Sequence, residues 1–82
     1  MRLDLYLKKS RIIKRRTQAK ILIDNNLVIL NDKIAKPSNL IKVDDIIKIT
    51  TYNRLTTYKV LSLENIPMFT IIKEEKRILD VK

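Results

Sequence analysis

The 82-residue chain contains no glycine. Tight turns usually depend on glycine because it adopts left-handed backbone without a steric penalty. Asn and Asp are the other residues that tolerate this conformation best. They occur as Asn25-Asn26, Asn31-Asp32 and Asp44-Asp45, at points where the hydrophobic pattern changes. The sequence therefore predicts a fold whose turns are built at these three pairs.

The N-terminal part of the sequence carries two helical patterns. The first spans residues 3 to 9, with Leu3 and Leu7 four residues apart and Asp4 near the positively polarised start. The second spans residues 16 to 25 and places three apolar side chains on one face: Ala19, Leu22 and Ile23. We expect both helices to contribute one face to the core.

Beyond Asn26 the pattern changes to period two, which is typical of strands. Residues 27–30 and 33–35 form a predicted hairpin that turns at Asn31-Asp32. Residues 46–50 and 56–63 read as two further strands, the last of which ends before Pro67. The tail is predicted to be a helix over residues 70–82, with Thr70 as its cap and apolar side chains at helical spacing: Ile71, Ile72, Ile78 and Leu79.

Positive charge is concentrated at the start of the chain. Residues 1–20 hold eight Lys or Arg and one acid, so their net charge is 8 − 1 = +7, whereas the other 62 residues hold ten bases and eight acids, a net +2. Four of the six arginines lie in the first 16 residues, and the planar guanidinium suits phosphate. This asymmetry indicates a polyanionic partner. The alternative is a basic surface that serves solubility alone.

The residue inventory disfavours catalysis. The chain has no His and no Cys, so the commonest general base, the strongest nucleophile and thiolate metal sites are all missing. Asp44-Asp45 and Glu74-Glu75 are neighbours in sequence whose carboxylates diverge. No apolar run approaches the roughly 20 residues that span a bilayer. We therefore expect a cytoplasmic protein that is not an enzyme, with no metal, no cofactor and no membrane partner.

The opening "RLDLYL" and the following "SRIIKRRTQAK" resemble the start of the RNA-binding domain named after the fourth small-subunit ribosomal protein, the S4 domain. The segment "NNLVILNDKIAKPSNLIKVDDIIKI" is similar to the hairpin, Pro-Ser connector and closing strand of that family. Asn26, Asp32 and Asp44 stand where the family often has glycine. The resemblance implies an α+β, S4-like (αL) domain over residues 1–65, with two N-terminal helices packed on a short antiparallel sheet, and a C-terminal extension over residues 66–82.

Among free-standing members, the chain is most similar to the RqcP family. This resemblance implies a monomer that binds rRNA and tRNA on stalled large ribosomal subunits and stabilises peptidyl-site tRNA while an RqcH-like factor adds alanine tails. It implies that Asp4 orients a neighbouring Arg; the alternative is a simple helix N-terminal acid. It also implies a set of phosphate-contacting residues: Arg2, Arg11, Lys14, Arg15, Arg16 and Lys20.

Other functions remain open at this level. A role in recycling or assembly of large subunits, as in heat-shock members of the family, uses the same surface. A DNA-binding module would need polar base-reading side chains on its helix, and Thr17 and Gln18 are the neutral candidates. A membrane-surface helix would need Trp or Phe opposite the basic face, and that segment has neither. Tyr6 either stacks on a base or packs in the core.

Overall fold

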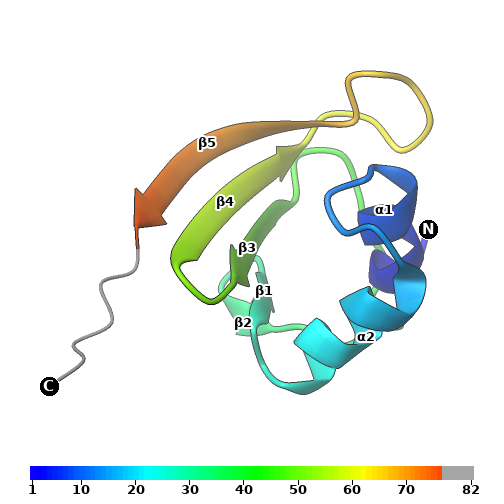
Figure 1. The fold of residues 1–82 in the computed structure, drawn as a ribbon. Helices are drawn as coiled ribbons and strands as arrows, with labels where there is room; N and C mark the ends of the chain where they lie inside the picture. The colour runs from blue at the N-terminus through cyan, green and yellow to red at the C-terminus, as the bar shows by residue number, and fades with distance from the viewer. Residues whose placement is uncertain (77–82) are drawn as a thin grey trace, which may run out of the picture.

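The computed structural model describes residues 1–76, in which two helices pack against one antiparallel sheet (Figure 1). The helices are α1 (Leu3–Lys9) and α2 (Arg16–Asp24). The sheet has the strand order β2-β1-β3-β4-β5. Its strands are β1 (Val28–Leu30), β2 (Lys33–Ile34), β3 (Ile46–Thr50), β4 (Arg54–Val60) and β5 (Phe69–Lys76). The predicted α+β architecture, with both helices before the sheet, is confirmed.

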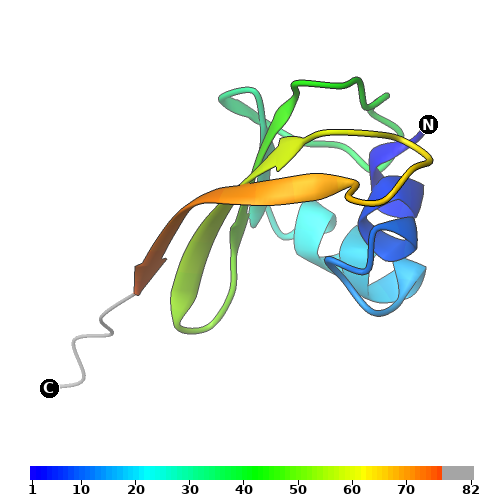
Figure 2. The ribbon, with the colours of Figure 1, turned by 90° about the horizontal axis from the view of Figure 1, so that it is seen from above.

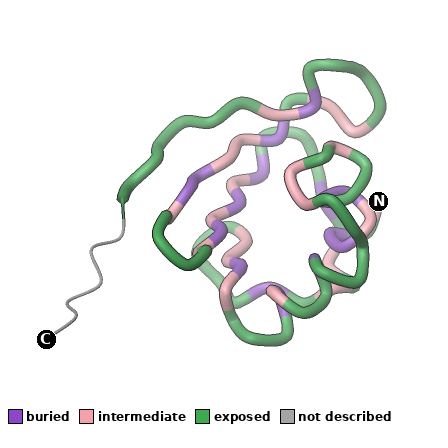
Figure 3. The backbone as a smooth tube through the Cα atoms, viewed as in Figure 1, coloured by how far each residue is buried: buried purple, intermediate pink, exposed green. Residues whose placement is uncertain are grey.

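The core lies between the helices and the concave face of the sheet, as the buried positions in Figure 3 show. Ala19 and Ile23, one turn apart on α2, are both buried, as the helical pattern predicts. Ile47 and Ile49, two residues apart on β3, are buried in the same way. Further members come from α1 and the other strands: Leu3, Tyr6, Leu7, Val28 and Val60.

Tyr6 belongs to this core. Its side chain is fully buried, and its hydroxyl donates a hydrogen bond of 2.6 Å to the backbone carbonyl of Met68. Burial raises the pKa of the Tyr6 hydroxyl to about 12. The ring packs in the interior and is not available to stack on a base.

The turns without glycine form where the Asn and Asp pairs predict them. Positive φ angles occur at Asn26 (60°), Asn31 (49°), Asp32 (68°) and Asp44 (75°). A fifth positive φ, 64°, falls on Arg11, which no pattern predicted. A left-handed backbone costs roughly 1–2 kcal/mol at a residue with a Cβ, and Asn or Asp reduce that cost through local hydrogen bonds. Arg11 has no such short polar side chain, so its conformation is imposed by its surroundings.

The predicted C-terminal helix is wrong over the residues that the structure describes. Phe69–Lys76 form β5, which pairs antiparallel with β4 from Val60↔Phe69 to Arg54↔Lys76. Thr70 lies within this strand and caps no helix. The β-branched run Thr70, Ile71 and Ile72 suits a strand, and β4 offers a free edge for it. Ile78 and Leu79 lie outside the described residues.

The far ends of β4 and β5 project away from the helices, as Figures 1 and 2 both show. All residues of β5 after Phe69 are exposed, which agrees with this projection. β5 nevertheless completes the sheet that begins in the N-terminal half of the chain. The division of the chain at residue 65 stays a prediction.

Candidate nucleic-acid interface

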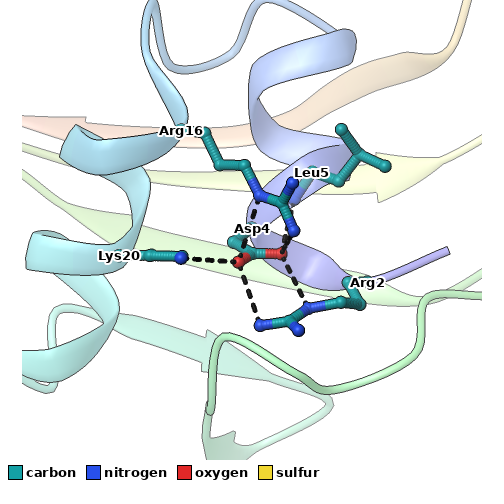
Figure 4. Close-up of polar contacts among 5 residues, drawn as sticks. All are labelled: Arg2, Asp4, Leu5, Arg16 and Lys20. Atoms are coloured by element: carbon teal, nitrogen blue, oxygen red, sulfur yellow. Dashed lines mark hydrogen bonds and ion pairs between the residues drawn. The ribbon is translucent and has the colours of Figure 1, made fainter.

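A buried carboxylate lies at the centre of the first basic group (Figure 4). Asp4 is the second residue of α1, and its side chain is 0% exposed. Arg2 donates from Nε to Oδ1 and from Nη2 to Oδ2, both at 3.2 Å. This paired geometry is the strong, directional form of an Arg–carboxylate contact. The backbone N–H of Leu5 adds a hydrogen bond of 2.8 Å to Oδ1.

The second helix delivers two more cations to the same carboxylate. Arg16 places Nη2 at 3.4 Å from Oδ1 and Nε at 3.3 Å from Oδ2. The Nζ atom of Lys20 lies 3.9 Å from Oδ2. Arg16 and Lys20 are four residues apart, so they occupy one edge of α2, beside the buried face that Ala19 and Ile23 form. The predicted position of both cations at the border of the buried face is confirmed.

Two opposing effects act on the Asp4 carboxyl. Burial raises its pKa, because desolvation disfavours the charged form. The hydrogen bonds from Arg16 and the Leu5 N–H, together with the charges of Arg16 and Arg2, outweigh burial and hold the pKa below its usual value. Asp4 is therefore ionised at neutral pH and holds the three cations in place.

The three cations around Asp4 still face solvent. The side chains of Arg2, Arg16 and Lys20 are 46%, 42% and 48% exposed. A guanidinium carries five N–H donors, and the contacts with Asp4 use only some of them. The group carries a net charge of 3 − 1 = +2 on positioned side chains. It can accept a phosphate without losing its internal contacts.

A second basic group lies around the segment that follows α1. Lys8, Lys9, Arg11 and Lys14 line one hollow of about 480 Å³. Within residues 1–76, no carboxylate forms an ion pair with any of these four cations. Lys8 and Lys9 lie in the last turn of α1 and were not among the predicted site residues. Their signal in the sequence was their contribution to the N-terminal charge, but only the chain reversal after α1 brings them beside Arg11 and Lys14.

The six predicted site residues thus divide into two places. Arg2, Arg16 and Lys20 converge on Asp4, whereas Arg11 and Lys14 line the hollow. Arg15 is exposed at the boundary between the two, as the residue that precedes α2. Both alternatives for Asp4 hold together, because it lies in the first turn of α1 and it also fixes neighbouring arginines.

Two other kinds of site were sought in the described part of the chain. Among residues 1–76, no three His, Cys, Asp or Glu side chains gather in a way that could hold a metal ion. Neither helix in this range has the length and apolar character needed to cross a bilayer.

Comparisons with known proteins give consistent matches. Residues 1–47 match the model of the S4 domain family. The chain is 41% identical to the RQC P-site tRNA stabilizing factor of Listeria monocytogenes, over 93% of this chain and 90% of that protein. It is 40% identical to the protein of the same name from Bacillus subtilis strain 168, over 93% of this chain and 96% of that one.

A solved structure has the same fold. The trimeric structure of Vibrio cholerae Heat Shock Protein 15 superposes with a TM-score of 0.75, covering 87% of this chain and 80% of that chain. The two sequences are 21% identical, so this likeness concerns the arrangement of helices and strands.

Proposed function

The chain belongs to the S4 domain family and to the family of RQC P-site tRNA stabilizing factors, and we propose that it binds rRNA and tRNA on stalled large ribosomal subunits. There it stabilises peptidyl-site tRNA during ribosome-associated quality control. The single observation that carries this proposal is the Asp4 cluster, in which one buried carboxylate positions Arg2, Arg16 and Lys20 at the surface. Positioned cations suit the regularly spaced phosphates of folded RNA.

The cluster acts by pre-organisation. A free Arg or Lys side chain loses rotamer freedom when it binds a phosphate, and this loss weakens the contact. Asp4 already restrains three such side chains in the unbound protein. Each charge-assisted contact to phosphate then contributes roughly 1.5–3 kcal/mol. The protein reads the shape and phosphate geometry of its RNA and needs no base-specific code at this cluster.

The same proposal extends to its setting. The protein works as a cytoplasmic monomer without catalytic activity and acts alongside an RqcH-like factor that adds alanine to the stalled nascent chain. The names of its relatives support the place of action, the peptidyl site. Deleting the gene in the organism that encodes it should abolish alanine tails on stalled chains. Normal tails, together with an accumulation of dissociated large subunits, would favour a recycling role instead.

Sedimentation with large ribosomal subunits tests the binding surface. Arg16→Ala removes one restrained cation, so subunit binding should weaken about ten- to a hundredfold. Arg16→Lys should restore part of the affinity, because it returns the charge without the guanidinium fork. The matched control is Arg54→Ala, which removes an Arg that pairs with Glu74 at 2.7 Å on the projecting end of the sheet. Equal losses for Arg16→Ala and Arg54→Ala would contradict the assignment of the surface.

A further inference from the structure

An apolar groove lies beside the basic surface. It has a volume of about 360 Å³ and runs between the segment after α1 and one face of α2. Ile21 on α2 is 61% exposed at this groove. The remaining lining consists of three partly buried aliphatic residues and two polar ones: Ile12, Ile13, Leu22, Lys14 and Gln18. An aliphatic floor with few polar groups is the usual lining of a small-ligand site, and such sites start at roughly 300 Å³.

The groove adjoins the hollow of unpaired cations. Lys14 lines both of them, so a cationic wall and an apolar floor meet at this residue. The segment between them is held on the end of α1, because the N–H groups of Arg11 and Ile13 donate hydrogen bonds of 3.0 Å to the carbonyls of Lys8 and Leu7. The left-handed backbone of Arg11 lies in this segment, and strained residues of this kind gather at binding sites.

We propose that the two hollows together bind one unpaired nucleotide of the RNA. Its base lies in the apolar groove against Ile21, and its phosphate lies among Lys8, Lys9, Arg11 and Lys14. A nucleotide has this division, with an anionic phosphate joined to a flat base whose faces are apolar. A base inside a helix is covered by its neighbours, so only an unpaired base can enter the groove.

Charge decides the identity of this occupant. A second copy of the chain would bring the same cations to the groove and would be repelled. An anionic polymer with exposed apolar faces fits both hollows, and single-stranded RNA is such a polymer. The amide of Gln18 offers a donor and an acceptor, so it can pair with the polar edge of any base. We therefore expect a preference for unpaired nucleotides with little preference among bases.

Three RNA duplexes with one common stem test this inference, which rests on the proposed RNA-binding function. One duplex is fully paired, one carries a single bulged uridine, and one carries an abasic bulge at the same place. Fluorescence anisotropy at one low salt concentration measures their affinity for the full chain. The bulged duplex should bind about tenfold more tightly than the other two, a factor within the range seen for burying one base. The abasic duplex separates base burial from greater backbone flexibility.

Ile21→Ala should reduce the affinity for the bulged duplex to that for the paired duplex. Alanine keeps the helical propensity of α2, so the melting temperature should stay close to that of the wild type. The matched control is Ile72→Ala, which truncates an Ile that is 53% exposed on β5 and outside the groove. This variant should keep the tenfold preference.

Equal wild-type affinity for the three duplexes, or equal losses in the two variants, would overturn the nucleotide site. Absence of binding to any of the duplexes would overturn it as well. Co-sedimentation with large ribosomal subunits separates this failure from a failure of the proposed function. If the protein still co-sediments, only the nucleotide site is wrong, whereas loss of both kinds of binding removes the function too.

Discussion

At the scale of single residues, Asp4 is the feature on which most of the interface depends. A fully buried carboxylate without partners would be strongly destabilising. Arg2, Arg16 and Lys20 supply opposite charges, and each keeps more than two fifths of its side chain exposed. Desolvation therefore falls mainly on the single acid, while the cations remain accessible to a ligand. This distribution combines stability with a binding surface.

Asp4→Asn should lower the free energy of unfolding by about 1–2 kcal/mol at pH 7, because the ion pairs are lost but their cations are partly screened by solvent. The pKa of Asp4 is lower in the folded protein than its model value of 3.8. The unfolded chain therefore takes up a proton first as the pH falls. The contribution of Asp4 is fully present above that value and is lost as the pH falls through the folded pKa. Chemical denaturation between pH 7 and pH 2 measures this, and the variant should lose less stability over that range.

The same variant separates positioning from net charge. Asp4→Asn makes the surface more positive by one unit, so simple attraction would tighten binding to large subunits. If Asp4 acts by holding Arg2 and Arg16 in place, binding should weaken severalfold despite the added charge. Binding that tightens or stays unchanged would show that the ordered geometry of the cluster is unimportant.

At the scale of elements, the turns replace glycine with side chains that also bond elsewhere. Asn31 has φ 49° in the turn between β1 and β2. Its Nδ2 donates a hydrogen bond of 3.0 Å to Oδ1 of Asp45, and its Oδ1 accepts one of 2.9 Å from the backbone N–H of Ile46. The hairpin is thereby joined to the start of β3. Asp32 has φ 68° in the same turn, and its carboxylate forms only a 3.7 Å pair with Lys48.

Substituting glycine at each turn position should therefore have opposite results. Asp32→Gly relieves the left-handed backbone and loses only an exposed ion pair, so stability should stay within about 0.5 kcal/mol of the wild type or rise. Asn31→Gly relieves the same kind of strain but loses two side-chain hydrogen bonds, so stability should fall by about 1–2 kcal/mol. Urea denaturation of the two variants checks the contrast. Similar changes in both would show that the Asn31 side chain has no joining role.

At the scale of the whole molecule, the charge lies almost entirely with the helices. The Cα radius of gyration is 12.3 Å, so the chain is too small to enclose a deep site and must bind across its surface. Of the net +9, the first 20 residues contribute +7. The sheet carries nearly balanced charge and includes local ion pairs such as Lys59 with Asp44 at 3.7 Å. Binding should therefore be electrostatic and confined to one side.

Salt dependence measures this confinement. If about five N-terminal cations meet phosphates, the logarithm of affinity should fall with the logarithm of salt concentration at a slope of roughly −4. Lys9→Ala should make the slope shallower by about 0.9, the value for one lost phosphate contact. Lys59→Ala, which removes a cation from the sheet, should leave the slope unchanged. A wild-type slope near zero would contradict the phosphate-contact mechanism.

The sequence by itself determined what depends on local preferences. The left-handed turns fall at Asn26, Asn31-Asp32 and Asp44 because few other residues tolerate that backbone. Both N-terminal helices follow from the spacing of apolar residues, and Arg16 borders the buried face of α2 for the same reason. The match of residues 1–47 to the S4 domain family confirms the resemblance that the opening motifs carry.

Only the tertiary structure decided what depends on contacts between distant segments. Ile71 and Ile72 fit a helix or a strand equally well, and the free edge of β4 selects the strand. The packing of α2 beside α1 brings Arg16 and Lys20 to Asp4, although twelve residues separate Arg16 from it in sequence. The reversal after α1 places Lys8 and Lys9 beside Lys14 and bends Arg11 into a left-handed backbone. Such effects arise from packing, which short-range sequence patterns do not encode.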